Sequence, residues 1–392
     1  MSGTRKRKVV LLGSTGSVGV STLKVARELP EHIEIIGLAA KCNVEKLAQQ
    51  ARETGVRHVA VYDAAQENRL RSLLQKGVKI YVGADGLNEL ATLAEADVVL
   101  IAIVGTAGLF PALSAIEAGK DLAIASKEIL VMAGEVITNA AARKGIHLLP
   151  VDSEHNAIHQ CLMCHRGGEA EISRLVLTAS GGPFRTLPAD QFAAITPAQA
   201  LQHPTWKMGA KITIDSATLF NKGLEMIEAR WLFGIGMDRI DVIVHPQSIV
   251  HSMVEFTDGS VLAQLSRTDM CFPIQYALTW PQRVKGGLQP LDFAALARLD
   301  FEAPRRLDFP ALDLAQQAGT LGGTLPAVYN ATNECAVEAF RRGEISFPTI
   351  WQCVAAVMQA HVCESSITLE SVVAADGWAR ETAAAFCQAH TR

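Results

Sequence analysis

The chain has 392 residues, which at about 150 residues per domain predicts two or three domains rather than one. Its 36 Lys and Arg residues nearly balance its 40 Asp and Glu residues, and the net charge of −4 argues against a nucleic-acid-binding protein. Hydrophobic residues make up 49% of the sequence, so the chain can bury sizeable cores. No apolar run approaches the roughly 18 residues that a membrane span needs, and we expect no membrane partner.

The N-terminus and the cysteines indicate the compartment. A basic run from Arg5 to Lys8 is followed by four apolar residues that end at Gly13, whereas the apolar core of a secretory signal needs about seven or more. The eight cysteines are spread thinly along the chain, unlike those of a small disulfide framework. We therefore expect a cytoplasmic protein with reduced thiols.

The first 150 residues alternate between apolar runs and helical patterns. The runs typical of buried strands are Val9–Gly13, Ile33–Ala40, His58–Tyr62, Val78–Val82, Val98–Val104 and Leu122–Ala125. Helical patterns run from Val20 to Leu29 and from Val44 to about Ala51. Strands that alternate with helices predict an α/β fold, here a Rossmann-like domain over residues 1–150 with a parallel sheet covered on both faces.

Residues 151–290 predict a central α+β domain. The expected strands are Ile172–Thr178, Ile240–Val244, and a hairpin of Ile249–Phe256 and Ser260–Ser266 across an Asp258-Gly259 turn. The segment from about 180 to 210 has one short helical stretch near Pro197–Gln202, and such a segment is usually a functional lid or disordered. Residues 291–310 have the prolines of a connector, and residues 311–392 predict a small helical bundle.

A glycine-rich loop follows the first expected strand. Gly13, Gly16 and Gly19 stand between that strand and a helix, where small residues let the backbone approach a pyrophosphate and the helix N–H groups face the anion. The same spacing also suits a tight strand-to-helix turn without a ligand.

The end of the second strand indicates which nucleotide is bound. An NAD enzyme typically has an acid there, but this chain has Lys41. A lysine at this place favours NADP(H), unless Lys41 is an ordinary solvated lysine.

Two further clusters carry charged side chains. Asp152 and Glu154 follow an apolar run, and their oxygens suit Mg²⁺ or Mn²⁺, although for this segment alone helix N-capping is the favoured explanation. In the second cluster Lys222 and Glu225 share a helix face if the helix begins near Asn221. The lysine there suits a phosphate and Glu225 suits a third metal oxygen, whereas the alternative is an exposed Lys–Glu pair.

Six segments of the sequence, taken together, resemble one family. They are GSTGSVG at 13–19, SKE at 126–128, PVDSEHNAI at 150–158, SGGPF at 180–184, HPTWKMGAKITIDSATLFNKGLEMIEA at 203–229 and HPQSIVHSMVEF at 245–256. In this order they are similar to the 1-deoxy-D-xylulose-5-phosphate reductoisomerase family. The resemblance covers the first two expected domains and is less specific over residues 311–392.

The resemblance implies a site for each ligand. It implies that Asp152, Glu154 and Glu225 bind a divalent cation, which would be Mg²⁺ or Mn²⁺, with Co²⁺ as a further candidate. It implies that Ser180, Ser216, Asn221 and Lys222 bind the substrate phosphate, and that Lys127, Ser153 and His203 bind the rest of the substrate. Lys127, His203 and Glu225 would act in catalysis. NADPH would contact Thr15, Gly16, Ser17, Val18, Asn43, Ser126, Glu128 and Gly209. Lys41 at the 2′-phosphate is expected from the second strand alone, because Lys41-Cys42 departs from the pattern of the family.

The same resemblance implies the reaction and the assembly. The enzyme would rearrange and reduce 1-deoxy-D-xylulose 5-phosphate to 2-C-methyl-D-erythritol 4-phosphate in the non-mevalonate isoprenoid pathway, as a homodimer with a lid around His203 to Met208. An NADP-dependent semialdehyde dehydrogenase and a catalytically silent NADP sensor are the alternatives. Such a dehydrogenase commonly uses a cysteine nucleophile, and none of the eight cysteines stands in an evident nucleophile context. The sensor would leave three carboxylates and a phosphate cluster unexplained.

Overall fold

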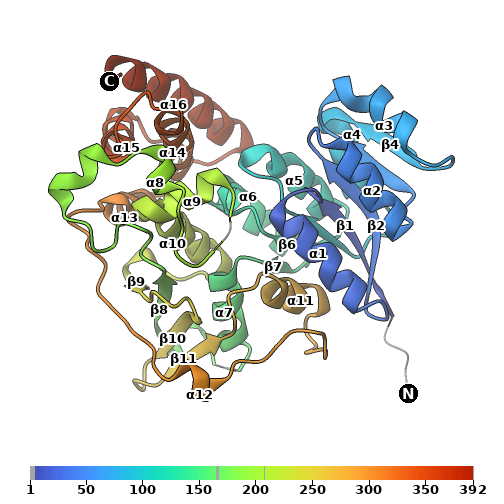
Figure 1. Ribbon diagram of the computed structural model, residues 1–392, viewed down its shortest axis with the longest axis horizontal. Coiled ribbons are helices and arrows are strands. Elements are labelled where there is room, and N and C mark those ends of the chain that lie inside the picture. Colours follow the sequence, from blue (N-terminus) through green and yellow to red (C-terminus); the bar gives the residue numbers. More distant parts are fainter. Residues whose placement is uncertain (1–4, 165–166, 207, 392) are drawn as a thin grey trace. The chain divides into compact units, whose positions relative to one another are not determined.

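The computed structural model describes residues 5–164, 167–206 and 208–391, which fall into two compact units (Figure 1). The first unit comprises Met1–Ile129, Ile137–Asn156 and Asp269–Gln289. The second unit comprises Leu130–Val136, Ala157–Thr268 and Pro290–Arg392. The boundaries expected near residues 150, 290 and 310 are a different division of the chain and stay a prediction.

A parallel sheet forms the centre of the first unit. Its described strands lie in the order β4-β3-β2-β1-β5-β6-β7, and every neighbouring pair is parallel. The strands are β1 (Arg7–Leu12), β2 (Ile33–Ala40), β3 (His58–Val61), β4 (Lys79–Val82), β5 (Val98–Ile101), β6 (Asp121–Ile124) and β7 (Leu148–Pro150). Each run predicted as a strand coincides with one of β1 to β6, and β7 is an additional short strand.

Helices cover both faces of this sheet. The helices α1 and α2 pack against β2, whereas α4 packs against β1, β3 and β4 and against α5. The bounds are α1 (Ser17–Glu28), α2 (Val44–Thr54), α3 (Glu67–Leu73), α4 (Gly83–Ala91), α5 (Leu109–Glu117), α6 (Lys127–Lys144) and α11 (Cys271–Thr279), with 3₁₀ turns η1 (Ala64–Gln66) and η2 (Thr106–Gly108). The predicted Rossmann-like domain is confirmed. The strand order reverses direction at β1, and in such sheets ligands bind at the carboxyl ends of the strands beside this point.

The second unit contains a mixed sheet. Its described strands have the order β11-β10-β8-β9, in which β8 and β9 are parallel and the other pairs antiparallel. The bounds are β8 (Ile172–Ala179), β9 (Ile240–Val244), β10 (Val250–Phe256) and β11 (Val261–Leu265). The predicted hairpin is therefore confirmed as β10 and β11. The expected α+β character of the central region is confirmed as well.

The C-terminal helices of the second unit share one hydrophobic core with this sheet. The core runs continuously from Leu175 on β8 through Phe220 and Phe340 to Cys387 near the C-terminus. The remaining elements are α7 (Ser153–Leu162), α8 (Pro197–Ala200), α9 (Ala210–Thr218), α10 (Phe220–Phe233), α12 (Phe293–Leu296), α13 (Ala311–Leu321), α14 (Leu325–Arg341), α15 (Thr349–Ala360) and α16 (Leu369–Ala389), with 3₁₀ turns η3 (Glu169–Glu171), η4 (Ala189–Ala194) and η5 (Met237–Arg239). The predicted helical tail is confirmed, and its helices pack against α9 and α10 as well as against one another.

Two expectations about the whole chain can be compared with the structure. All eight cysteines are free thiols. None of the helices in the described ranges is long and apolar enough to pass through a membrane.

Candidate active site

The glycine-rich loop between β1 and α1 has a shape that only glycine permits at two positions. Gly13 has φ +94°, and a Cβ there would lie 2.3 Å from the carbonyl oxygen of Ala102. A Cβ on Gly19 would lie 2.4 Å from the carbonyl oxygens of both Gly13 and Ser14. The first turn of α1 is therefore pressed against the loop. Gly16 is the N-cap residue, no side chain caps the helix, and its first turn carries no acid, so the N–H groups of this end suit an anion.

The helix α2 fixes the other side of this loop. The buried Ser14 hydroxyl donates to Oε1 of Gln50 at 2.8 Å, and Gln50 Nε2 donates to the Ser14 carbonyl at 2.9 Å. Lys46 Nζ donates to the Thr15 carbonyl at 2.8 Å, while the Asn43 side chain caps α2 by accepting from the Lys46 amide at 3.2 Å. Lys41 is exposed at the end of β2, as a contact with a 2′-phosphate would require. Lys46 is a cation beside the loop that sequence reasoning missed.

The start of α6 holds three of the expected residues. Ser126 is the N-cap, its side chain is buried, and its hydroxyl donates to the carbonyl of Ile103. Lys127 and Glu128 follow in the first turn and are also buried. Burial of a lysine requires a partner for its charge, and Lys127 Nζ lies 2.5 Å from Oδ2 of Asp152.

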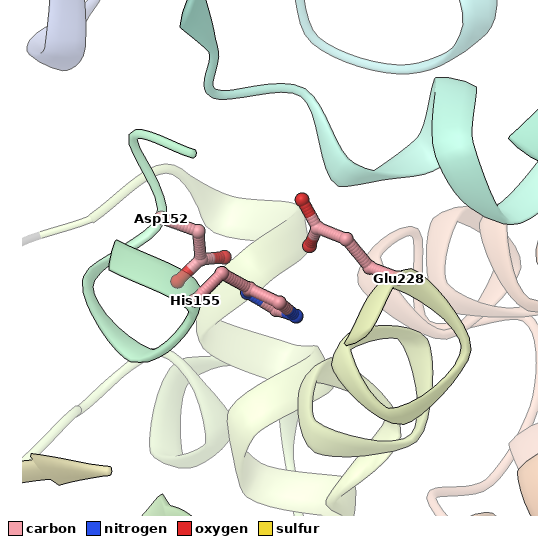
Figure 2. Close-up of side chains that lie close together, drawn as sticks. All are labelled: Asp152, His155 and Glu228. Atoms are coloured by element: carbon pink, nitrogen blue, oxygen red, sulfur yellow. The ribbon is translucent and has the colours of Figure 1, made fainter. Parts of the chain in front are cut away.

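Asp152 and Glu154 lie at the start of α7, as the apolar run before them predicts. Burial by itself would raise the pKa of Asp152, but the adjacent Lys127 ammonium, His155 and a hydrogen bond with Glu154 hold it well below its usual value. A ring nitrogen of His155 and a carboxylate oxygen of Asp152 lie within 4.8 Å of each other, one turn apart at this helix end (Figure 2). Ser153 Oγ donates to Oε2 of Glu154 at 2.5 Å. Asp152 is thus available as an anionic oxygen donor, and the carboxyl group of Glu154 lies two residues further along the chain.

In the second unit the loop after β8 meets the start of the expected lid. Ser180 Oγ and His203 Nε2 are 2.9 Å apart. His203 Nδ1 accepts from the backbone amide of Trp206 at 2.9 Å, so the proton of the neutral ring is on Nε2 and is donated to Ser180. Burial lowers the pKa of His203, which favours this neutral form. Gly182 approaches α9 so closely that a Cβ would lie 2.7 Å from the Ser216 carbonyl oxygen.

The helices α9 and α10 carry the phosphate-type cluster. Lys222 and Glu225 form an ion pair one turn apart, both almost fully buried, and Asn221 Nδ2 donates to Oε1 of Glu225 at 2.6 Å. The exposed Lys–Glu pair considered from the sequence is therefore wrong. Ser216 lies in the last turn of α9, and its hydroxyl donates to the Ile212 carbonyl at 2.8 Å. Ser180, His203, Ser216, Asn221, Lys222 and Glu225 all belong to the second unit, whereas Lys127, Asp152, Ser153 and Glu154 belong to the first.

Two buried polar residues of the second unit, Glu228 and His251, were not predicted to act. Glu228 projects from α10, one turn after Glu225, and is fully buried (Figure 2). Burial, with help from Lys222 and His245, lowers the pKa of His251 to about 4. The ring centroids of His251 and Trp206 are 6.4 Å apart, which brings β10 to the expected lid. Sequence reasoning could treat His251 only as a possible core histidine because its neighbours come from distant segments.

The structure describes the expected lid except for Lys207, and it also describes Gly209 at the end of this segment. The segment from 180 to 210 contains η4 and α8, so the short helix expected near Pro197–Gln202 is confirmed. Lys207, in the middle of the expected lid, lies outside the described residues. Gly209 is the N-cap of α9, and its carbonyl accepts from Thr213 Oγ1 at 2.9 Å. A closing motion of this segment and a cofactor contact at Gly209 stay predictions.

Comparison with known proteins assigns the family. Three family models match the chain: 1-deoxy-D-xylulose 5-phosphate reductoisomerase at residues 9–134, its C-terminal domain at 148–233, and the DXP reductoisomerase C-terminal domain at 265–382. The chain belongs to the 1-deoxy-D-xylulose 5-phosphate reductoisomerase family. The semialdehyde dehydrogenase and the silent sensor are therefore wrong as interpretations.

Relatives in this family match the chain over nearly its full length. A reductoisomerase of Chlorobium chlorochromatii is 51% identical over 381 residues, which are 97% of this chain and 99% of that protein. One of Rhodococcus jostii is 53% identical over 383 residues, covering 97% and 94%. The structure of the Zymomonas mobilis reductoisomerase in complex with NADPH is 44% identical with a TM-score of 0.90, covering 98% of this chain and 100% of that one. A reductoisomerase structure with NADPH, fosmidomycin and magnesium is 38% identical, also with a TM-score of 0.90, covering 97% and 98%.

Proposed function

We propose that this chain catalyses the NADPH- and divalent-cation-dependent rearrangement and reduction of 1-deoxy-D-xylulose 5-phosphate to 2-C-methyl-D-erythritol 4-phosphate, for non-mevalonate isoprenoid precursor synthesis. The observation that carries this function is identity of about half of all residues to reductoisomerases over 97% of the chain. Solved reductoisomerases of the same fold hold NADPH and magnesium, which supports the same two partners here.

The NADPH site is proposed at the carboxyl ends of the parallel strands. Thr15, Gly16, Ser17 and Val18 would meet the pyrophosphate through backbone N–H groups, because Gly16 leaves the end of α1 without a side-chain cap. Lys41 and Asn43 would lie beside the adenosine ribose and its 2′-phosphate. Ser126, Glu128 and Gly209 would contact the rest of the cofactor. When bound, NADPH supplies the hydride for the reduction.

The proposed metal ligands are Asp152, Glu154 and Glu225, as the family resemblance implies. Asp152 and Glu154 stand at the start of α7, and Glu225 is buried on α10. Carboxylate oxygens are the ligands that Mg²⁺ and Mn²⁺ prefer, so this set fits such a cation and also accepts Co²⁺. Lys127 pairs with Asp152, and its ammonium helps to hold the pKa of that carboxyl well below the usual value. Lys222 pairs with Glu225. A bound cation would stabilise negative charge that develops on the substrate oxygens.

The second unit is proposed to hold the substrate phosphate. Lys222 supplies a buried positive charge, and Ser180, Ser216 and Asn221 supply short side chains that donate hydrogen bonds. Anchoring the phosphate away from the reacting carbons orients those carbons for reaction. His203 would donate its Nε2 proton to a substrate oxygen instead of to Ser180. Like His203, Ser153 would contact the part of the substrate beyond the phosphate.

Lys127 is proposed to act on the reacting oxygens. Its ammonium is buried and adjacent to Asp152, where it can stabilise negative charge on a substrate oxygen or pass a proton to it. A lid around His203 to Met208 would exclude water while the rearranged aldehyde awaits reduction. We place the enzyme in the cytoplasm as a homodimer, in line with the family resemblance.

Turnover tests the function. The full chain is mixed with 1-deoxy-D-xylulose 5-phosphate, NADPH and Mg²⁺ or Mn²⁺, and the reduced nicotinamide absorbance is followed while the product is identified by NMR. We expect consumption of NADPH with equal formation of the branched tetritol phosphate, and its arrest by a chelator. Absence of consumption with every divalent cation would contradict the proposal.

A further inference from the structure

A buried ion pair lies directly behind the proposed phosphate site. Asp215 precedes Ser216 on α9 and is 1% exposed. One carboxylate oxygen lies 2.7 Å from Lys211 Nζ, one turn earlier, and the other accepts from Asn333 Nδ2 of α14 at 2.9 Å. None of these three residues is among those proposed to touch substrate, cofactor or metal.

The helix α14 also reaches α10, one turn away from Asn333. Tyr329 is fully buried, and its hydroxyl donates to the Ala311 carbonyl at 3.2 Å. A Cβ on Gly223 would lie 2.3 Å from the Tyr329 hydroxyl oxygen, so α10 touches this side chain one residue after Lys222. Because residues four apart share a helix face, one face of α14 contacts both α9 and α10.

The junction between α9 and α10 needs such external support. Leu219 joins the two helices with φ +63°, the left-handed conformation that is unfavourable for a residue with a side chain. Ser216 stands before this junction, and Asn221 and Lys222 stand after it. The relative orientation of the proposed phosphate ligands thus depends on contacts that hold both helices, and a buried ion pair is weak as a source of stability alone.

We infer that Asp215 is a positioning residue for the substrate-phosphate site: held by Lys211 and Asn333, it fixes the last turn of α9, and with it Ser216, against the same face of α14 that supports α10. This inference rests on the proposed function. Asp215 itself would touch neither the substrate nor the cofactor. Its effect is therefore on the affinity for phosphate and not on hydride transfer.

Two variants and a matched control test this role. Asp215→Asn removes the charge that Lys211 pairs with, and Asn333→Ala removes only the hydrogen bond from α14. The control is Glu334→Gln, next to Asn333 on α14. Glu334 is also a largely buried carboxylate in an ion pair, but its partner is Arg380 of α16, at 2.7 Å, and not a residue of α9. For each variant we measure the melting temperature, kcat, KM for 1-deoxy-D-xylulose 5-phosphate, KM for NADPH, and inhibition by inorganic phosphate.

Asp215→Asn and Asn333→Ala are expected to raise KM for the sugar phosphate by roughly 10- to 100-fold, as small misplacements of binding groups do, and to weaken inhibition by phosphate in parallel. In both variants kcat and KM for NADPH stay within about two-fold, and Glu334→Gln changes only the melting temperature. If both variants lower the melting temperature as Glu334→Gln does and leave KM and phosphate inhibition unchanged, the positioning role is overturned. If Asp215→Asn does not fold, Asn333→Ala decides by the same readouts. Failure of the proposed function would appear separately, as absence of turnover in the unmodified chain.

Discussion

Gly19→Ala is the substitution whose effect follows most directly from the geometry of the nucleotide loop. The added methyl group would lie 2.4 Å from two carbonyl oxygens, those of Gly13 and Ser14, about 1 Å inside van der Waals contact. Neither oxygen belongs to a flexible side chain, so the loop or the first turn of α1 must move. Overpacking of this kind costs about 1–3 kcal/mol. If the strain is relieved when the loop opens, NADPH binding weakens by the corresponding factor of about 5- to 150-fold.

The assay is titration of the full chain with NADPH, followed by nicotinamide fluorescence, together with thermal unfolding. Gly16→Ala is the matched control for strain, because its Cβ would meet nothing closer than 3.5 Å and its φ is −76°. We expect Gly19→Ala to lower both the melting temperature and the NADPH affinity, and Gly16→Ala to unfold at the original temperature. Unchanged NADPH affinity in Gly19→Ala would refute the reasoning that this loop, in this conformation, holds the cofactor.

Three other predictions concern charge. Lys222→Met is expected to raise KM for the sugar phosphate by about 10- to 100-fold, the value of a buried charged hydrogen bond, with NADPH affinity unchanged in a direct titration. Lys41→Glu is expected to weaken NADPH binding roughly five-fold without weakening NADH binding, since only NADPH carries a 2′-phosphate. Because burial lowers the pKa of His251 from 6.5 to about 4, the folded protein binds fewer protons than the unfolded chain between these pH values. The free energy of unfolding should therefore fall by up to about 3 kcal/mol as the pH drops through this window, and His251→Gln should remove that share, measured by denaturant titrations at several pH values.

Each of these predictions has a contrary result. Lys222→Met with an unaltered KM would separate this lysine from the phosphate, and equal effects of Lys41→Glu on both nucleotides would remove Lys41 from the 2′-phosphate. For His251, identical pH dependence of stability in the two proteins would mean that the imidazole is not buried in its neutral form.

The sequence predicted the strands of the first unit well because fully buried parallel strands are continuous apolar runs. Ile33–Ala40, for example, has the expected bounds. The short β7 was missed, since three residues between a helix and a turn carry too little pattern. The sharing of one core by β8 and the C-terminal helices was also invisible, because this contact joins segments more than 100 residues apart and leaves no local period.

The sequence predicted which residues belong to the site, but not which of their side chains contact one another. The spacing of Lys222 and Glu225 indicated one helix face, yet only the tertiary structure places this pair inside the second unit. The contact of Lys127 with Asp152 crosses from α6 to α7, and neither segment carries a signal for the other. Asp215 could have been paired with Lys211 from their spacing of four, but its partner Asn333 is 118 residues away.

Binding of Mn²⁺ to the full chain, measured by electron paramagnetic resonance in the presence of NADPH and the sugar phosphate, tests the proposed metal site most directly. We predict one Mn²⁺ per chain, with binding lost in Asp152→Asn, Glu154→Gln and Glu225→Gln alike and kept in Asp376→Asn, a carboxylate that pairs with Arg380 on α16. Full Mn²⁺ binding by Glu225→Gln, beside its loss in Asp152→Asn, would contradict a single cation held by these three carboxylates.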